Sequence, residues 1–252
     1  MKIAVMGSGG VGGYFGARLA AGGADVHFVA RGAHLEAMRS QGLSIEGGPS
    51  PLHLSDVQAT SEPSSIGIAD FVLIAVKLWD TAAAIEQVAP IVGPQTTVIS
   101  FQNGVLKDNY LSEAFGAARV MGGVGYIAST IDRPGVIRQT GPLQRLLFGE
   151  LDGTTSERAE RLLQACLKGG IAAQATPDIR REIWQKFVFL VGLSGTTTTI
   201  RRWVRSGRMR RPVPSCSTSC GKSWRWRART AWICLPTMRS SASRWPTRWP
   251  TI

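Results

Sequence analysis

The chain has 252 residues, which is enough for one large domain or two modest ones. It has no run of about 18 apolar residues that could span a bilayer, so we expect no membrane partner. Met1 leads directly into a segment that resembles a strand and not a signal peptide, so we expect a cytoplasmic protein. The single cysteine of the first 200 residues, Cys166, implies no disulfide framework there.

The net charge of +12 is unevenly distributed along the chain. Residues 1–200 contain 16 basic and 17 acidic residues, whereas residues 201–252 contain 13 basic residues and no acidic residue. Six of the eight tryptophans also lie in residues 201–252. The basic excess therefore belongs to the tail, and we expect no nucleic-acid partner for the body of the chain.

The first motif is a glycine-rich loop between a strand and a helix. Residues 2–6 form a short apolar run typical of a buried parallel strand, and helix-forming residues follow the loop. In this pattern the first glycine permits a tight turn, the second lets a pyrophosphate approach, and the third lets helix and strand pack closely. The predicted cofactor-binding residues are Gly7, Ser8, Gly9, Gly10, Val11 and Gly12.

The end of the second predicted strand, residues 25–30, favours NADPH over NADH. Enzymes that use NAD commonly place an acidic residue there to bind the ribose 2′-hydroxyl, and this chain places Arg31. A guanidinium pairs with a 2′-phosphate, whereas a carboxylate repels it. The alternative is that Arg31 is only a solvated loop residue.

Two further site candidates follow predicted strands at 71–76 and 97–101. Lys77 ends the first of these strands, and Asn103 lies in the Gln-Asn-Gly sequence after the second. Ligands bind outside the carboxyl ends of strands in an open α/β sheet, which makes both residues candidates. A plain Asn-Gly turn is the alternative for Asn103.

The remaining elements complete a Rossmann-type, doubly wound parallel sheet followed by the start of an all-α domain. Helices are expected at 34–41, 81–92 and 156–168, and strands at 119–128, 136–140 and 146–150. Residues 176–178 suit a linker and a helix start, and a helical pattern runs on from Ile179. We therefore expect a Rossmann domain over 1–175 and the start of a helical domain over 176–200. Lys186, in an apolar stretch of that helix, is either snorkelling or functional.

Taken together, these motifs resemble the ketopantoate reductases (2-dehydropantoate 2-reductases) over residues 1 to about 200. The resemblance rests on the glycine loop, on Val76-Lys77, on Gln102-Asn103-Gly104 and on residues 183–187. It implies reduction of a small 2-keto acid with NADPH on the route to pantothenate. By position, Lys186 is similar to the general acid of the family, Asn103 to the residue that places nicotinamide and substrate, and Lys77 to a cofactor contact. The resemblance implies no metal site.

Two features depart from the family pattern. The helix after the lysine carries asparagines in the family, whereas residues 187–194 contain none, so another branched 2-keto acid stays open as substrate. The family's later serine and glutamate have no counterpart in residues 201–252, so this chain could bind NADPH without activity. Two alternative functions stay open. One is another hydroxy-acid dehydrogenase of the same architecture, and the other is a non-catalytic nucleotide-binding protein. For a full-length chain a homodimer is left open.

Residues 201–252 read as a segment translated in the wrong frame. Arg, Trp, Ser, Cys and Pro dominate without helical periodicity, as in a GC-rich gene read out of frame. A shift of one base lets synonymous codons for residues 202–210, 216–229 and 231–248 encode segments resembling the family's second domain. The two longer segments read as acid-balanced amphipathic helices. The alternatives are a nucleic-acid-binding arm, in which basic residues and tryptophans contact phosphates and bases, and a membrane-surface segment.

Overall fold

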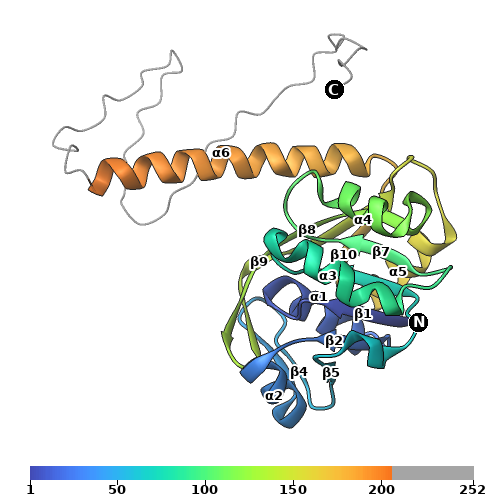
Figure 1. Ribbon diagram of the computed structural model, residues 1–252. Helices are drawn as coiled ribbons and strands as arrows, with labels where there is room; N and C mark the ends of the chain where they lie inside the picture. The colour runs from blue at the N-terminus through green and yellow to red at the C-terminus, as the bar shows by residue number, and fades with distance from the viewer. Residues whose placement is uncertain (206–252) are drawn as a thin grey trace. The chain divides into compact units, whose positions relative to one another are not determined.

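The computed structural model describes residues 1–205, and the interpretation of the tail therefore falls almost entirely outside the described residues. Residues 1–202 form one compact unit (Figure 1). The strands are β1 (Lys2–Met6), β2 (Asp25–Val29), β3 (Leu43–Glu46), β4 (Leu52–Leu54), β5 (Gln58–Thr60), β6 (Phe71–Ile74), β7 (Thr97–Ser100), β8 (Val120–Arg133), β9 (Val136–Glu150) and β10 (Ala172–Ala175). The α-helices are α1 (Gly10–Ala21), α2 (Gly32–Gln41), α3 (Thr81–Val88), α4 (Lys107–Phe115), α5 (Glu157–Lys168) and α6 (Ile179–Arg205). Short 3-10 turns are η1 (Pro63–Ile66), η2 (Leu78–Asp80), η3 (Ala89–Ile91) and η4 (Ala117–Arg119).

One sheet organises the described part of the chain, in the order β4-β3-β9-β8-β7-β6-β1-β2-β5, with β10 paired to β9. Six neighbouring strands of this order, β8, β7, β6, β1, β2 and β5, are mutually parallel. Strand β1 lies at the centre of these six. The chain adds β2 and β5 on one side of β1 and then β6, β7 and β8 on the other, as in dinucleotide-binding folds. Antiparallel pairing occurs only at β8–β9 and β3–β4 among the described strands. The prediction of a Rossmann-type doubly wound sheet is confirmed, with these antiparallel additions.

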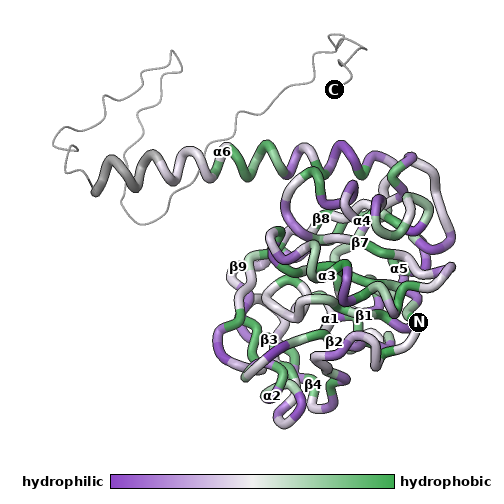
Figure 2. The backbone as a smooth tube through the Cα atoms, in the orientation of Figure 1, coloured by the Kyte–Doolittle hydropathy of each residue, from purple (hydrophilic) through white to green (hydrophobic). Residues whose placement is uncertain are grey.

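Both faces of the sheet are buried under helices. Along β1, Ile3 and Val5 pack into a cluster with α1 and α5, whereas Ala4 and Met6 pack with α3 and α4 on the opposite face. This alternation is the two-residue period of a strand, and full burial on both faces explains the continuous apolar run. Each fully buried Ile, Val or Met side chain of this strand stabilises the fold by about 2 kcal/mol. Figure 2 shows these central strands as hydrophobic tubes inside the body.

The structure corrects the prediction of two separate strands at 136–140 and 146–150. They form one strand, β9, which pairs with β8 along most of its length. The register shifts between Ile127 and Ser129, because residues 140–143 have no partner on β8. Gly141 (φ +75°) is followed by Pro142, which has no N–H to donate to the ladder. The break predicted between the two strands is therefore present, but it is a bulge within β9 and not a loop between two strands.

Three other elements also differ from the prediction. The expected helix at 81–92 ends at Val88 and continues as the 3-10 turn η3, because Pro90 cannot continue an α-helix. Helix α4 and strand β10 were not predicted.

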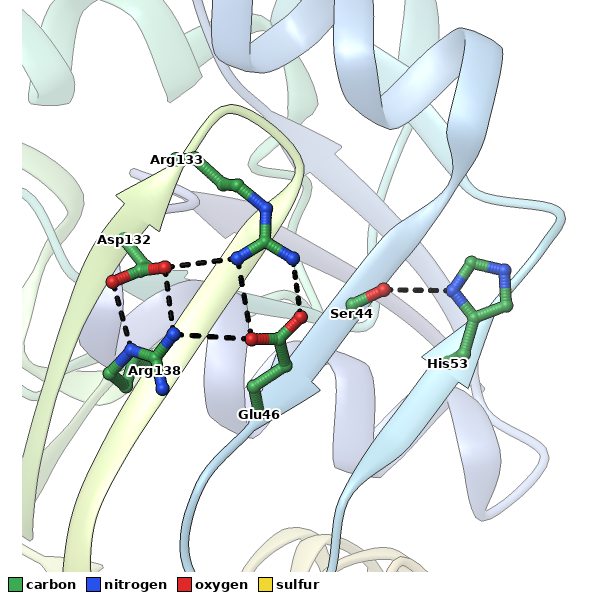
Figure 3. A network of polar contacts seen from close by, with 6 residues as sticks. All are labelled: Ser44, Glu46, His53, Asp132, Arg133 and Arg138. Atoms are coloured by element: carbon green, nitrogen blue, oxygen red, sulfur yellow. Dashed lines mark hydrogen bonds and ion pairs between the residues drawn. The ribbon is translucent and has the colours of Figure 1, made fainter.

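A cluster of charged side chains attaches the β8–β9 hairpin to β3. Arg133 and Arg138 lie between the carboxylates of Asp132 and Glu46, and the Arg138 Nε donates to Asp132 at 2.8 Å (Figure 3). The hydrogen bonds from Arg138 are the main cause that lowers the pKa of Asp132 to about 2. Strand β8 also lies very close to the first turn of α1. A Cβ on Gly10 would lie 2.2 Å from the Ser129 carbonyl oxygen, so this approach requires a glycine at position 10.

Helix α6 begins on the sheet and carries a long apolar stretch. Ile179 and Ile183 are buried against Val124 of β8 and Leu147 of β9. Farther along, Val188, Phe189 and Val191 are exposed, and Figure 2 shows this part of α6 as hydrophobic. Within the described residues, no helix combines the length and apolar character that a membrane crossing needs.

Candidate functional site

The glycine loop joins β1 to α1 in a conformation that depends on its glycines. Gly7 has φ +95°, and a Cβ there would lie 2.7 Å from the Val76 Cγ1. A Cβ on Gly12 would lie 2.2 Å from the Gly7 carbonyl oxygen, so α1 packs closely on the strand. A Cβ on Gly9 would meet nothing within 4 Å. The loop is thus closely packed on the protein side and open at Gly9, where the N-terminus of α1 presents free N–H groups.

Ser8 is held on the inner side of this loop. Its Oγ donates to the Val29 carbonyl oxygen at 2.9 Å, and its N–H donates to the same oxygen at 3.2 Å. The His34 Nδ1 accepts the Gly135 N–H at 3.1 Å, which leaves the Nε2–H to donate to the Ser8 carbonyl oxygen at 2.9 Å. Burial lowers the pKa of His34, and the hydrogen bond to Ser8 opposes that shift. A neutral His34 therefore links the glycine loop to the β8–β9 hairpin.

A cleft of about 1210 Å³ opens at the carboxyl ends of β1, β6 and β7 and extends to α6. This volume is large enough for a dinucleotide and a small acid. Of the predicted site residues, seven line the cleft: Gly7, Gly9, Gly10, Val11, Lys77, Asn103 and Lys186. Ser8, Gly12 and Arg31 are not among its lining residues.

Arg31 lies at the edge of this arrangement. It follows β2 by two residues, next to the Val29 carbonyl oxygen that holds Ser8, and its side chain is exposed. Its Nη2 donates to the Gln87 Oε1 of α3 at 3.4 Å. The guanidinium is thus exposed at the end of β2, where a long hydrogen bond to Gln87 is its contact with α3.

Gln102 joins the two strand ends that carry Lys77 and Asn103. Its Nε2 donates to the Val76 carbonyl oxygen at 3.1 Å and to the Thr81 Oγ1 at 2.9 Å. Its Oε1 accepts from the Ser100 Oγ at 2.9 Å. Because Gln102 is buried, these bonds hold the loop after β7 against the loop after β6.

Lys186 reaches the cleft from the second turn of α6. Its Nζ donates a hydrogen bond to the Gly125 carbonyl oxygen of β8 and lies 5.4 Å from the centre of the Tyr126 ring. Burial is the main cause that lowers the pKa of Lys186 to about 8, and the positive charge of Lys107 acts in the same direction. An ammonium has three N–H groups, so two remain for a ligand.

The sequence analysis missed a buried ion pair next to the site, where Lys107 borders a small cavity with Asn103 and Lys186. Lys107 and Asp108 open helix α4, and the Lys107 Nζ lies 2.8 Å from the Asp108 Oδ1. The Lys107 side chain is 1% exposed and that of Asp108 7% exposed. The only sequence signal was a Lys-Asp pair directly after the Asn-Gly loop, and nothing in its spacing indicates burial.

The arrangement combines an anion-binding loop with a proton donor. The N-terminus of α1 favours a phosphate group at Gly9, and Lys186, which lines the same cleft, presents an acid with a pKa of about 8. Among the described residues, no group of three or more His, Cys, Asp or Glu side chains is placed to hold a metal ion.

Comparison with known proteins places this geometry in a family. A family model described as "Ketopantoate reductase PanE/ApbA" matches residues 3–153. The chain belongs to the ketopantoate reductase family. A 2-dehydropantoate 2-reductase of Mesorhizobium japonicum is 38% identical over 208 residues, which cover 74% of this chain and 63% of the relative. Ketopantoate reductases are oxidoreductases, and the resemblance stated from the sequence motifs is thus confirmed.

Solved structures of ketopantoate reductases share the fold. The 2-dehydropantoate 2-reductase from Geobacter metallireducens matches with a TM-score of 0.71 and 31% identity, over 75% of this chain and 62% of that one. D-mandelate dehydrogenase, solved with NADH and anilino(oxo)acetate, matches with a TM-score of 0.67 and 18% identity, over 74% of this chain and 60% of that one; this likeness shows the fold alone. The chain spans less than two thirds of the length of the Mesorhizobium relative and the Geobacter structure.

Proposed function

We propose that the chain is the cofactor-binding part of an NADPH-dependent 2-dehydropantoate 2-reductase, which reduces ketopantoate to pantoate for pantothenate synthesis. The observation that carries the proposal is the position of Lys186. Its ammonium lies in the same cleft as the glycine loop, and its pKa of about 8 suits a proton donor near neutral pH.

The residues around the cleft fit an NADPH molecule. The open space at Gly9 and the N-terminus of α1 suit its pyrophosphate, and Arg31 at the end of β2 suits its 2′-phosphate. The predicted binding residues Gly7, Ser8, Gly10, Val11 and Gly12 shape this loop, of which Ser8 and Gly12 act from inside the fold. Lys77 and Asn103 line the same cleft as the glycine loop and Lys186.

Lys186 would act on the substrate and not on the cofactor. NADPH supplies a hydride when bound, and the ketone oxygen then needs a proton. The Lys186 ammonium, fixed by the Gly125 carbonyl oxygen, would donate that proton and stabilise negative charge on the same oxygen. Asn103 would position the reacting groups from the loop after β7.

The substrate itself is proposed as a small branched 2-keto acid, with ketopantoate first. Phe187, Leu190 and Val191 line the cleft beside Lys186, so an apolar branched side chain would find apolar contacts there. The second candidate is reduction of another branched 2-keto acid. Rates with NADPH and a panel of 2-keto acids separate the two, because a ketopantoate reductase gives its highest kcat/KM with ketopantoate.

NADPH specificity is tested by direct titration of the chain. We expect the dissociation constant for NADPH to be at least tenfold lower than that for NADH, because only NADPH carries the 2′-phosphate that Arg31 can pair with. Equal affinities would contradict the cofactor assignment. In the chain with its frame restored, binding of NADPH without reduction of any 2-keto acid would support a non-catalytic nucleotide-binding protein.

The domain organisation is part of the proposal. We infer a Rossmann domain over 1–175, the start of a helical substrate domain over 176–200, and an out-of-frame tail over 201–252. The coverage of relatives and the absence of acidic residues after position 200 support it. Sequencing the gene across codons 195–205 tests it: an inserted or missing base supports it, and an intact frame contradicts it. In frame, the enzyme is proposed to be a cytoplasmic protein, and a homodimer is the assembly to test.

A further inference from the structure

Lys107 and Asp108 form an ion pair in the protein interior, beside the proposed active site. Burial is the main influence on both groups: it lowers the pKa of Lys107 and raises the pKa of Asp108, while their mutual attraction opposes both shifts. A buried ion pair is generally no more stabilising than a well-packed apolar pair of the same volume. Lys107 borders a small cavity together with Asn103 and Lys186, and this position points to a role other than stability.

The first part of that role is visible in the hydrogen bonds of Lys107. Its Nζ donates to the Ser100 carbonyl oxygen at 2.8 Å and to the Asp108 Oδ1 at 2.8 Å. Ser100 is the last residue of β7 and Lys107 is the first of α4, so this bond closes the loop 101–106 at its base. Asn103 lies at the middle of that loop and lines the cleft.

The second part follows from the position of the charge. A small cavity of about 10 Å³ is bordered by Lys107, Asn103 and Lys186. Lys107 and Lys186 thus lie on one cavity that has room for about one water molecule. The positive charge of Lys107 adds to burial in lowering the pKa of Lys186.

We propose that the Lys107–Asp108 pair is a positioning element of the active site, in which Lys107 fixes the Asn103 loop and places a second positive charge beside Lys186. This inference rests on the proposed function of Lys186 as proton donor. Asp108 neutralises the pair as a whole, so that the interior accepts the Lys107 ammonium. The repulsion between the two ammonium groups keeps the Lys186 proton transferable near neutral pH.

Other ionisable groups border Lys186 and have to be considered in any titration. Tyr126 lies under its ammonium, and burial together with the charge of Glu182 raises the pKa of that phenol, so Tyr126 is neutral around pH 8. Glu182 lies one turn earlier on α6. Across the cleft, the charged lining residues are Lys77 and Asp80.

The test measures the protonation of Lys186 directly, without relying on catalysis. Trace acetylation of the full chain from about pH 6 to 11, read by mass spectrometry, reports the unprotonated fraction of each lysine. The variants are Lys107→Met, Lys107→Arg, which keeps the charge, and Lys107→Met/Asp108→Asn, which removes both charges and leaves no unpaired ion. Lys168, exposed on α5, is the internal reference. NADPH titration and circular dichroism establish that each variant is folded.

We expect the acetylation midpoint of Lys186 to rise by about one pH unit in Lys107→Met, to rise by less in the double variant, which also removes the Asp108 charge, and to stay within about 0.3 unit in Lys107→Arg. If Lys107→Met does not fold, the double variant decides. An unchanged Lys186 midpoint in a folded variant without the Lys107 charge overturns the proposal. Absence of reductase activity in the chain with its frame restored, together with the expected shifts, would contradict the proposed function alone, so the two failures are distinguishable.

Discussion

Lys186 on α6 donates a hydrogen bond to the main-chain carbonyl oxygen of Gly125 on β8, a residue 61 positions earlier in the chain. The bond fixes the ammonium over the Tyr126 ring and beside the cleft that begins at the glycine loop. The ammonium and the amine of Lys186 both carry N–H groups, so either form can donate this hydrogen bond, the charged form more strongly. A donor to Gly125 therefore remains on Lys186 before and after proton transfer.

The pH dependence of reduction is the first prediction. Burial lowers the pKa of Lys186 to about 8, and the proposed acid is active only when protonated. The kcat/KM for reduction should therefore be level at low pH and fall about tenfold per pH unit above about pH 8. Steady-state rates of the chain with its frame restored, measured across this range, check it. A rate that rises through pH 8 would show that Lys186 is needed as the amine.

The glycine loop gives a prediction that separates folding from binding. A Cβ on Gly9 meets no atom within 4 Å, so Gly9→Ala should keep the melting temperature of the unaltered chain. The added methyl group would nevertheless occupy the space proposed for the pyrophosphate, and the dissociation constant for NADPH should rise at least tenfold. Thermal unfolding and NADPH titration measure the two effects.

Gly12→Ala is the matched control for that substitution. Its Cβ would lie 2.2 Å from the Gly7 carbonyl oxygen, so the variant should lose roughly 1–3 kcal/mol of unfolding free energy through overpacking. Tight NADPH binding by a stable Gly9→Ala variant would show that the cofactor does not approach the loop at Gly9.

Arg31 is expected to determine the choice of cofactor. Arg31→Glu replaces a guanidinium by a carboxylate at the end of β2, which should raise the dissociation constant for NADPH at least tenfold and leave that for NADH unchanged or lower. Lys168→Gln, which removes a positive charge from the surface of α5, should change neither constant. Equal losses for NADPH and NADH in Arg31→Glu would show a structural role and no contact with the 2′-phosphate.

His34 should make stability depend on pH. Because burial lowers its pKa in the folded chain, the unfolded chain binds the proton first as pH falls. The contribution of neutral His34 is thus complete above about pH 6.5 and is lost as the pH falls to the lower folded pKa. The melting temperature should decrease more between about pH 7.5 and 5.5 in the unaltered chain than in His34→Gln. Parallel curves would exclude His34 from this dependence.

Much of the fold could be predicted from local sequence. The apolar runs of β1, β6 and β7 and the glycines of the first loop are short-range signals, and the structure places them as expected. The β8–β9 hairpin could not be predicted in the same way. Its pairing joins residues up to 29 positions apart, and the unpaired residues 140–143 resemble a loop until Gln144 is seen opposite Ile127.

The candidate site shows the same division. The positions of Lys77 and Asn103 follow from the rule that ligands lie at the carboxyl ends of strands, and both line the cleft. The surroundings of Lys186 depend on contacts with β8 and α4, so its hydrogen bond to Gly125 and its neighbour Lys107 could not be inferred from the spacing of residues on α6. Ser8 belongs to the loop motif and was therefore predicted to bind the cofactor, but its side chain points into the fold toward the Val29 carbonyl oxygen.

The most direct test of the central claim compares Lys186→Met with the unaltered residue in a chain whose codons after about position 200 are restored to the proposed frame. NADPH oxidation is followed in the presence of ketopantoate, and NADPH binding is titrated separately. The account predicts substrate-dependent oxidation that falls about 100-fold to 10,000-fold in Lys186→Met, with an NADPH dissociation constant within about twofold of the unaltered chain. Equal rates for the two proteins, both binding NADPH, would contradict it.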